Sequence, residues 1–250
     1  MINLSTQNNI LNYKMCIINT TNAASNIIMS YNKNITYNNT SNINYIAKRD
    51  FLFRFVQPAI RMQLKMDDES LYSTTDQLTA DRISKDILKF IPSTSTITDA
   101  TACIGGTAYS FAQHFDKVNA IEIDSVRYRL MLNNLNILLK EIQKNNVICI
   151  NNDALIACKH LKQDAVFIDP PWGGPDYKQN SKLSLYLSNM ELSVVCKNLH
   201  TYTKYIVIKV PTNFDELTFI NNTELYMELV NKNTTLRKMY LLIFKCKKNI

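Results

Sequence analysis

After Pro92, short apolar runs alternate with longer stretches in which apolar residues recur at helical spacing. Short runs rich in Val, Ile and other apolar residues are typical of buried strands. They predict strands at 96–102, 118–124, 146–151, 165–171 and 205–211. The stretches between them predict helices near 107–115, 125–142, 154–161 and 184–199. Strands that alternate with helices in this way indicate a parallel sheet that is covered on both faces.

The last part of the chain has a different pattern. Apolar runs at 225–230 and 238–246 are separated by a short polar turn, which predicts an antiparallel hairpin. Five parallel strands followed by a hairpin is the order of the class I S-adenosylmethionine-dependent methyltransferase sheet. We therefore predict an α/β, Rossmann-like fold with a seven-stranded sheet. The hairpin makes an ordinary dinucleotide-binding dehydrogenase a poorer match.

The chain ahead of Pro92 divides into two parts. Residues 1–44 contain 13 Asn and no Asp or Glu, and a polar segment without apolar periodicity predicts a disordered or loosely packed head. Residues 45–92 mix aromatic and basic side chains and include a capped amphipathic helix at 74–91. The predicted organisation is a head at 1–44, a helical extension at 45–92 and a methyltransferase domain at 93–250.

Charge and cysteine usage narrow the function only a little. The formal net charge of +7 favours a polyanionic partner such as nucleic acid. Six cysteines are scattered with no CxxC and no pairing with the three histidines, so we expect free thiols in a reducing, intracellular compartment, nuclear or cytoplasmic, and no metal site. The uncharged run between Lys14 and Lys33 is too rich in Asn and Thr to span a bilayer, so we expect neither a membrane segment nor a signal peptide.

The four glycines form two pairs, and the first pair lies where the first predicted strand gives way to a helix. Ligands of open α/β sheets bind at this edge, and glycine lets the backbone pass close to them. Asp99 ends the first strand, Glu122 the second and Asp153 the third. With Gly105 and Gly106, this spacing predicts an S-adenosylmethionine site, in which Glu122 binds the ribose hydroxyls and Asp153 the adenine amino group. A tight turn without a ligand, and a helix cap at Glu122, remain open as alternatives.

The second glycine pair lies in "DPPWGGPDY" (169–177), directly after the fourth strand and so at the same edge. The Asp169 side chain and the Pro170 carbonyl can each accept a hydrogen bond from an N–H group of an aryl amine. The fixed φ of proline holds that carbonyl in place. Trp172 offers a face on which a base can stack. The motif therefore predicts methylation of an exocyclic amine of a base, with these three residues in catalytic roles. The alternative is a turn that ends a strand and buries the indole.

The segment "PPWGGPDY" (170–177) resembles the motif of the trimethylguanosine synthase family, the RNA cap guanine-N2 methyltransferases. "YSTT" (72–75), "AIEID" (120–124) and "LNN" (132–134) are similar to further segments of that family, so the resemblance covers residues 45–246. It implies methyl transfer from S-adenosylmethionine to the 2-amino group of the 7-methylguanosine cap, with capped RNA as partner and no metal. It also implies that Trp172 stacks on the methylated guanine, that Thr75 and Glu122 contact the cofactor, and that Asn134 contacts the cap.

Two positions depart from the family pattern. Asp169 replaces a serine, which makes the acceptor anionic and also makes "DPPW" similar to adenine-N6 methyltransferases. A carboxylate beside a cationic 7-methylguanine is a favourable electrostatic match. Cys103 replaces the first glycine of a Gly-x-Gly-Gly turn. We expect Cys103 to adopt a normal φ and to crowd the methionine end of the cofactor.

Basic residues ahead of the sheet complete the predicted site. Lys48 and Arg54 are predicted to hold the triphosphate bridge of the cap, which makes residues 45–92 a cap-contacting extension, and a solvated helix face is the alternative. Other functions stay open: an adenine-N6 methyltransferase, another guanine-N2 methyltransferase acting on RNA or DNA, or a cap-binding module that has lost catalysis. The sequence does not predict how many methyl groups are added or which RNAs are used.

Overall fold

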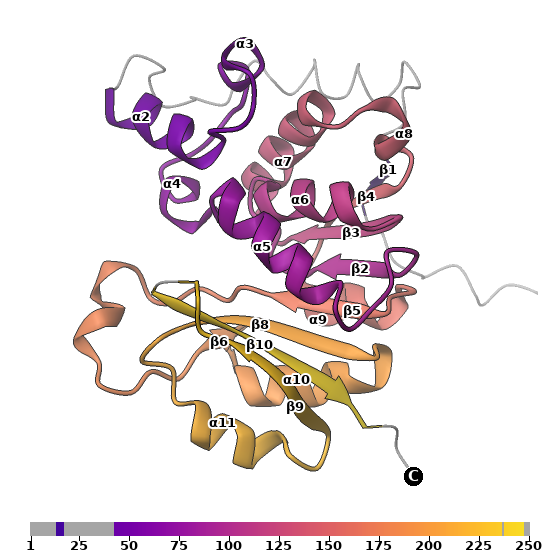
Figure 1. The fold of residues 1–250 in the computed structure, drawn as a ribbon, viewed down its shortest axis with the longest axis vertical. Helices are drawn as coiled ribbons and strands as arrows, with labels where there is room; N and C mark the ends of the chain where they lie inside the picture. The colour runs from indigo at the N-terminus through magenta and orange to yellow at the C-terminus, as the bar shows by residue number, and fades with distance from the viewer. Residues whose placement is uncertain (1–13, 18–42, 237, 248–250) are drawn as a thin grey trace, which may run out of the picture.

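The computed structural model describes residues 14–17, 43–236 and 238–247 of the chain. Its centre is a sheet of eight strands in the order β1-β4-β3-β2-β5-β8-β10-β9 (Figure 1). The strands are β1 (Lys14–Ile17), β2 (Thr96–Asp99), β3 (Lys117–Glu122), β4 (Val147–Asn151), β5 (Ala165–Ile168), β8 (Tyr205–Pro211), β9 (Met227–Asn233) and β10 (Met239–Cys246). Strands β2, β3, β4, β5 and β8 are parallel, and β10 runs antiparallel to both β8 and β9.

This strand order confirms the predicted class I arrangement. Strand β8 has the predicted bounds, whereas β2 ends at Asp99 and β5 at Ile168, before the predicted ends at 102 and 171. The residues that follow these two strands leave the ladder and form the connections to α6 and to the Pro-Pro turn. Both stretches therefore lie beyond the carboxyl edge of the sheet, where open α/β sheets bind their ligands.

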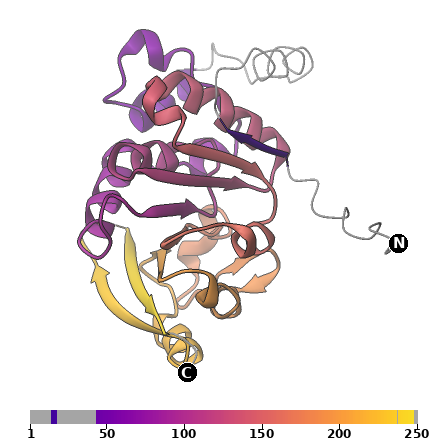
Figure 2. The same ribbon diagram turned by 90° about the vertical axis from the view of Figure 1, so that its right-hand side faces the viewer.

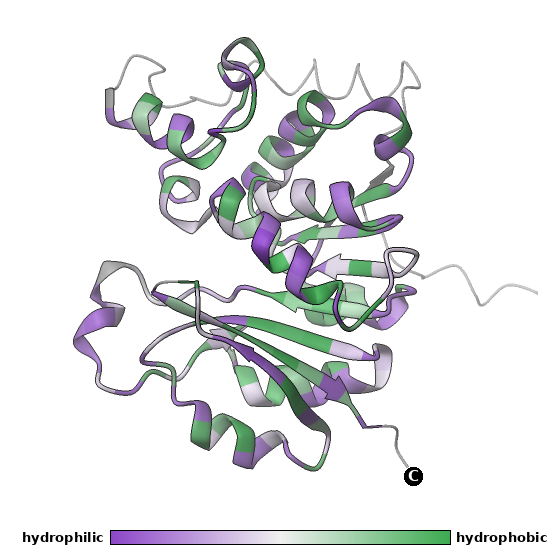
Figure 3. Ribbon diagram, in the orientation of Figure 1, coloured by the Kyte–Doolittle hydropathy of each residue, from purple (hydrophilic) through white to green (hydrophobic). Residues whose placement is uncertain are grey.

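Helices cover both faces of the sheet, as the alternating pattern predicts. They are α5 (Gln77–Ile87), α6 (Gly106–His114), α7 (Ser125–Leu138), α8 (Glu141–Lys144), α9 (Ala154–Ala157), α10 (Leu192–Leu199) and α11 (Glu216–Thr223), with 3-10 turns η1 (Cys158–His160), η2 (Pro175–Gln179) and η3 (His200–Tyr202). Strand β5 shows how the faces divide. Ala165 and Phe167 pack with α5, α6 and α7 in one core cluster, and Val166 and Ile168 pack with α9, α10 and α11 in the other. Figure 3 shows the green of hydrophobic residues along much of the central strand β8.

Two of the predicted helices are only partly confirmed. The helix expected at 125–142 is interrupted at Leu139 and Lys140, whose backbone is extended, so that it forms α7 and α8. The first half of the helix expected at 184–199 is a hairpin of β6 (Tyr186–Leu187) and β7 (Met190–Glu191). Its turn residues Ser188 and Asn189 have φ values of 52° and 62°, a left-handed conformation that no helix contains. Helix α11 is not predicted by the sequence pattern.

The extension ahead of the sheet consists of α2 (Ile43–Leu52), α3 (Pro58–Arg61) and α4 (Ser70–Ser73), followed by α5. Side chains from the first part, including Phe53 and Met66, pack on Ile104 and on Leu130 of α7 in a third core cluster. Helix α5, which corresponds to the predicted helix at 74–91, packs instead on the main sheet core. The extension is therefore joined to the sheet through two packed surfaces.

Part of the predicted head forms a strand. Strand β1 pairs antiparallel with β4, with Lys14 opposite Asn151 and Ile17 opposite Ile148, and it adds one strand to the edge of the predicted seven (Figure 2). These four residues are ordered in a strand, and the rest of the predicted head, at 1–13 and 18–42, lies outside the described residues. Within the described ranges, no helix has the length and apolar character needed to cross a membrane.

Candidate active site

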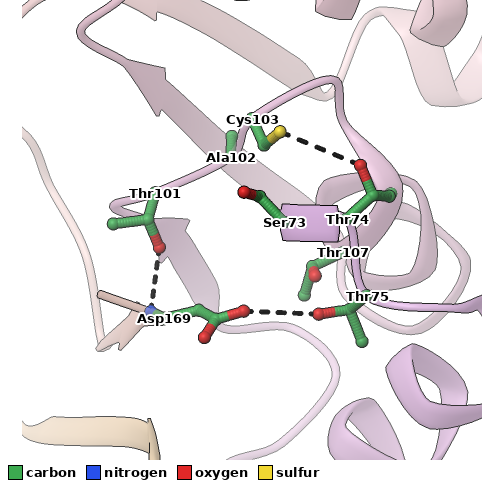
Figure 4. A pocket seen from close by; sticks show the side chains of 9 residues that line it. Ser73, Thr74, Thr75, Thr101, Ala102, Cys103, Thr107 and Asp169 are labelled. Atoms are coloured by element: carbon green, nitrogen blue, oxygen red, sulfur yellow. Dashed lines mark hydrogen bonds between the residues drawn. The ribbon is translucent and has the colours of Figure 1, made fainter. Parts of the chain in front are cut away.

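A pocket lies at the carboxyl edge of the sheet, between the ends of β2 and β5 (Figure 4). Three stretches of chain line it: the segment Ser73–Thr75 ahead of α5, the turn between β2 and α6, and Asp169 after β5. The turn contributes Thr101, Ala102, Cys103, Gly106 and Thr107. Gly106 from the first glycine motif and Asp169 from the second therefore line one pocket.

The first glycine pair is required by packing within the protein. Gly105 has a φ of 92°, and a Cβ on it would lie 3.0 Å from Leu135 Cγ of α7. A Cβ on Gly106 would lie 2.8 Å from Cγ2 of Thr74 and 3.2 Å from the carbonyl oxygen of Thr75. The sequence predicts glycine at these two positions because a ligand needs the space, and packing within the protein is a second reason. These glycines also let α7 and the segment Ser73–Thr75 approach the turn.

Cys103 does not have the backbone conformation expected from the sequence. Its φ is 51°, in the left-handed region, so the expectation of a normal φ is wrong. This conformation favours glycine, which is the residue that the family resemblance implies at this position. Its thiol lies 3.8 Å from the Thr74 hydroxyl, and burial raises the pKa of the thiol to about 12, so that it stays neutral. Cys103 lines the pocket as an uncharged side chain.

Asp169 is held at several points. Its backbone N–H donates to the Thr101 hydroxyl at 2.8 Å, which ties the end of β5 to the end of β2. Its Oδ2 accepts from the ammonium of Lys209 in an ion pair and from the Thr75 hydroxyl at 3.4 Å. Burial raises the pKa of the Asp169 carboxyl, and Lys209 and Thr75 oppose that rise. Asp169 is therefore held by residues from three other parts of the chain, two of which contact its carboxylate.

Lys209 is a site residue that the sequence prediction missed. Strands β5 and β8 are parallel, with Ile168 opposite Ile208, so that the next residues, Asp169 and Lys209, are also neighbours. The lysine side chain is 7% exposed, and its ammonium donates to the Thr75 hydroxyl at 2.8 Å. A signal was present in the sequence, because Lys209 is the one charged residue in the otherwise apolar strand "YIVIKVP".

Asp99 is an acid that the protein leaves partly without partners. The residue is 0% exposed, its Oδ1 accepts from the Thr101 N–H at 3.2 Å, and its Oδ2 has no hydrogen-bond partner within the described chain. Burial raises its pKa to about 8, and the negative charges of Asp169 and Glu122 act in the same direction. A buried oxygen without a partner next to a pocket is an acceptor that a ligand can use.

The other two predicted cofactor acids hold the backbone in place. Glu122 accepts from the Cys103 N–H at 2.9 Å and from the Asp124 N–H at 2.8 Å, with Arg127 Nε 3.7 Å from its Oε1. Burial raises the pKa of the Glu122 carboxyl. Asp153 caps α9, with its Oδ1 accepting from the Leu155 N–H at 2.7 Å. Glu122 is hydrogen-bonded to Cys103 of the turn that lines the pocket, whereas Asp153 does not line the pocket.

Trp172 lies beside the Asp169–Lys209 pair. The indole is half-buried, packs on the second core cluster and meets Tyr177 edge-on at 5.2 Å. The ammonium of Lys209 lies 5.4 Å from its ring centroid. Its Nε1 is buried without a partner among the described residues. The buried Pro170 has a carbonyl that accepts no hydrogen bond in that same part of the chain.

The structure corrects the prediction for Asn134. Its side chain is 0% exposed and fully used within the protein. Oδ1 accepts from the Lys65 N–H at 2.8 Å, and Nδ2 donates to the carbonyl oxygens of Lys65 at 2.9 Å and of Ile104 at 3.2 Å. Asn134 therefore fastens the extension to the glycine turn. It is not the solvent-facing helix end that was the alternative, and both N–H donors of its buried amide are used within the protein.

The predicted phosphate-binding residues lie outside the pocket lining. Arg54 donates to Asp76 at 3.0 Å and stacks on the Phe51 ring, with 4.1 Å between the guanidinium carbon and the ring centroid. The Lys48 ammonium lies 5.7 Å from the centroid of the Tyr72 ring. Both cations are on the surface of the extension, beside the segment that closes the pocket, and no described residue neutralises Lys48 through a salt bridge within 4.0 Å.

Two acids beside the pocket, neither of them among its lining residues, suit functional groups of S-adenosylmethionine. The unpartnered Asp99 oxygen suits an ammonium, and Glu122 offers carboxylate lone pairs at the edge where ribose hydroxyls bind. The empty space around these residues is about 200 Å³ and part of it is open to solvent, so the pocket is smaller than typical small-molecule sites. Thr74 and Thr75 lie against Gly106, so a whole cofactor requires this segment to move outward. No metal site is expected, and the described ranges contain no group of three His, Cys, Asp or Glu suited to a metal ion.

Comparison with known proteins identifies the family. The model of the RNA cap guanine-N2 methyltransferases matches residues 94–246. An uncharacterized protein of Acanthamoeba polyphaga mimivirus is 37% identical over 154 residues, which is 60% of this chain and 57% of that protein. The trimethylguanosine synthase of Schizosaccharomyces pombe (strain 972 / ATCC 24843) is 31% identical over 156 residues, 60% of this chain and 64% of that protein. The chain thus spans about three fifths of the length of these relatives.

A solved structure shows the same fold. A protein from Porphyromonas gingivalis W83 described as a methyltransferase has a TM-score of 0.56 to this chain at 14% identity, covering 91% of this chain and 58% of that one. The fold and the family both imply S-adenosylmethionine as methyl donor. The family match runs to the end of β10 and includes the whole "DPPWGGPDY" turn. This chain belongs to the RNA cap guanine-N2 methyltransferase family.

Proposed function

We propose that this protein transfers a methyl group from S-adenosylmethionine to the exocyclic 2-amino group of the 7-methylguanosine cap of RNA, giving di- or trimethylguanosine. The observation that supports this most is that Asp169, the first residue of the acceptor motif, lines the same pocket as Gly106 of the donor turn. Methyl transfer requires the two reacting atoms to approach within ~3–3.5 Å. A shared pocket is the arrangement that such a transfer needs.

On the donor side, the chain's own residues bind the cofactor. Asp99 Oδ2 accepts from the α-ammonium group, and the N–H groups at the start of α6 face the carboxylate. Glu122 accepts from the ribose hydroxyls, and Asp153 remains the predicted partner of the adenine amino group. When bound, the cofactor supplies an electrophilic methyl group. The segment Ser73–Thr75 then closes over it and excludes water from the reacting atoms.

On the acceptor side, Asp169 and the Pro170 carbonyl orient the amine. Each accepts a hydrogen bond from one N–H group of the amine. These two hydrogen bonds align the nitrogen lone pair with the methyl group. Trp172 stacks on the base. As the new N–C bond forms, the C–S bond to the donor breaks, and one proton of the amine is lost to solvent. Lys48 and Arg54 contact the phosphates of the cap from the surface of the extension.

The ion pair with Lys209 changes the electrostatic argument for a cationic base. The sequence predicts that an anionic Asp169 attracts the positively charged 7-methylguanine. Because Asp169 and Lys209 together carry no net charge, that attraction is weaker than a free carboxylate would give. A preference for the 7-methylated base therefore has to come from Trp172, whose aromatic face attracts a cation.

Methyl transfer to four acceptors tests the proposal. Labelled S-adenosylmethionine is offered with 7-methylguanosine-capped RNA, the same RNA with an unmethylated guanosine cap, uncapped RNA and DNA. Nuclease digestion and mass spectrometry then identify the methylated nucleoside and the number of methyl groups. We expect N2-methylated 7-methylguanosine from the first RNA alone. Preferred methylation of uncapped RNA or DNA, or of adenine, would instead establish one of the rival methyltransferase functions.

Trp172→Ala is the matching variant. Loss of a stacking face should weaken cap binding by about 5- to 150-fold, from the ~1–3 kcal/mol that base stacking contributes, and leave the affinity for S-adenosylmethionine within about twofold. Tyr202→Ala is the control, because Tyr202 is 41% exposed and lies in η3, ahead of the amino end of β8 and so at the opposite edge of the sheet. Calorimetry measures both affinities. Equal loss of cap and cofactor binding would mean that the indole is structural, and a wild type that binds the cap but not the cofactor would be an inactive cap-binding module.

A further inference from the structure

Lys209 is a buried cation in the middle of the apolar strand β8. The residue is 5% exposed, and no other charged side chain occurs in this strand. Transfer of a lysine and a carboxylate out of water costs several kcal/mol for each ion, and an apolar pair of similar volume is often at least as stable. The burial of Lys209 is therefore not explained by stability of the sheet. Its contacts point to the acceptor side of the pocket.

The contacts of Lys209 leave the two oxygens of Asp169 in different states. Oδ2 accepts from the Lys209 ammonium and from the Thr75 hydroxyl, and the ammonium and hydroxyl are themselves 2.8 Å apart. Oδ1 takes part in none of these contacts, and the Asp169 side chain is 13% exposed where it lines the pocket. One oxygen is thus anchored, and the other has no hydrogen-bond partner among the described residues. Figure 4 shows the anchored oxygen on the side of Thr75.

We propose that Lys209 is a positioning residue for methyl transfer: with Thr75 it fixes Asp169 Oδ2 and thereby presents Oδ1 to the amine that is methylated. The inference rests on the proposed function, because it requires an amine as the acceptor. It also accounts for the aspartate at position 169, where the family pattern has a serine. A neutral acceptor there needs no counter-ion, whereas a carboxylate at the floor of an apolar sheet does, and Lys209 supplies it from the adjacent strand.

The charges around Asp169 explain why the lysine matters. Lys209 on β8 is the cation in direct contact with it, Asp99 on β2 is a neighbouring carboxyl, and Glu122 on β3 lies farther along the same edge. Thr75 is neutral. Without Lys209, burial would raise the pKa of the Asp169 carboxyl with only the hydrogen bond from Thr75 opposing the rise. A protonated carboxyl is a weaker acceptor of an N–H bond than a carboxylate, so the amine would no longer be held.

Four variants test this role: Lys209→Met, Asp169→Ser, the double variant, and Lys144→Met as control. Lys144 is also a buried lysine, 8% exposed and paired with Glu141 at 2.8 Å, but it lies in α8 and outside the pocket lining. The rate constant kcat, the KM for the methyl acceptor and the pH profile are measured for each, together with the thermal unfolding midpoint. Carbon-13 NMR follows the titration of Asp169 directly.

We expect Lys209→Met to lower kcat at neutral pH by about 10- to 100-fold, the cost of a misplaced reacting group, with a smaller change in KM. Its rate should recover as pH rises, because only the ionised Asp169 holds the amine, whereas the wild type and Lys144→Met stay flat over the same range. The double variant should return to within about threefold of Asp169→Ser, because effects within one contact network are not additive.

Two results would overturn the role of Lys209. One is an unchanged kcat and pH profile in Lys209→Met. The other is a double variant more than about 10-fold less active than Asp169→Ser, which would mean that the lysine acts independently of Asp169. A wild type that methylates none of the offered acceptors would instead refute the proposed function. In that case the NMR titration decides about Lys209 alone, because the same Asp169 titration in wild type and Lys209→Met would overturn its positioning role.

Discussion

At the scale of single residues, Asp99 shows how the site departs from what stability alone favours. Its carboxyl lies at the end of β2 at 0% exposure, with one oxygen lacking a partner in the described chain. Burial, followed by the charges of Asp169 and Glu122, holds its pKa at about 8. A bound ammonium group would donate a hydrogen bond to the unpartnered oxygen of Asp99 and would place a positive charge beside its carboxyl. Such unsatisfied groups are retained where a ligand completes them.

We predict that Asp99→Asn flattens the pH dependence of stability and makes the protein more stable at about pH 8. The folded protein keeps this proton up to about pH 8, whereas the unfolded chain loses it near the ordinary value of 3.8. The folded state therefore binds more protons between these two values, and wild-type stability falls as pH rises through them. The substitution should restore about 1–3 kcal/mol at the upper end. Urea unfolding across this range measures it, and equal pH slopes in both proteins would contradict it.

Sequence predicts the residues of the pocket better than it predicts their contacts. Asp169, Gly106 and Thr75 all line the pocket, because each belongs to a motif or follows a recognisable strand end. Lys209 is not predictable in this way, since its partner is set by the register of β5 and β8, which exists only in the folded sheet. The contacts of Asn134 are not predictable for the same reason. Its hydrogen bonds run to residues 30 and 69 positions away.

At the scale of elements, the connection between α4 and α5 is the part of the chain that closes the pocket. Thr74 and Thr75 lie against the first turn of α6, and only the missing Cβ of Gly106 makes room for them. Gly105 serves a different contact, with Leu135 of α7. The turn between β2 and α6 is thus enclosed on two sides by other elements. Any widening of the pocket has to move the Thr74–Thr75 side, because α7 is part of the main core.

We predict that Gly106→Ala weakens S-adenosylmethionine binding and that Gly173→Ala does not. An added methyl on Gly106 would meet Thr74 Cγ2 at 2.8 Å and displace the closing segment, with a stability loss of about 1–3 kcal/mol. Gly173 has a φ of 88° but nothing within 4 Å of an added Cβ, so its substitution costs only backbone strain of about 1–2 kcal/mol. Urea unfolding and cofactor titration separate the two effects. Equal cofactor affinities in both variants would show that the closing segment takes no part in binding.

Two predicted helices differ from the structure at particular residues. The hairpin of β6 and β7 stands in place of half a helix because Ser188 and Asn189 adopt positive φ, which non-glycine residues rarely do and which an apolar pattern cannot reveal. The predicted helix at 125–142 breaks at Leu139 and Lys140 without proline or glycine. By contrast, the long apolar run of β8 has its predicted bounds, because a strand buried on both faces has the clearest signature in the sequence.

At the scale of the whole molecule, the functional unit is larger than the segment that matches the family. The match begins at residue 94, yet Ser73, Thr74 and Thr75 complete the pocket. Helix α5 also belongs to the main core, and its Ser84 shares a 2.8 Å hydrogen bond with Ser110 of α6. The predicted boundary at residue 92 therefore does not separate two independently packed units.

We predict that removing residues 1–92 abolishes cooperative unfolding, whereas removing residues 1–42 does not. The longer deletion takes away Ile83, Ile87 and Ile91, all at most 4% exposed in the main core. Burial of each such side chain contributes about 1.5–3 kcal/mol, so together they amount to about 5–9 kcal/mol, against a total stability of about 5–15 kcal/mol for a domain. The shorter deletion removes β1 from the edge of β4 but leaves that core and the pocket segment intact.

Thermal unfolding followed by circular dichroism and by the fluorescence of Trp172, the single tryptophan, distinguishes the two deletions. The protein lacking residues 1–42 should unfold in one transition and bind S-adenosylmethionine, because α2 to α5 still cover the core and close the pocket. The protein lacking residues 1–92 should show a broad, non-cooperative change and no cofactor binding. A sharp transition near the wild-type temperature for the longer deletion would mean that the sheet and its remaining helices form a complete core without α5, and that the extension acts only on the ligand.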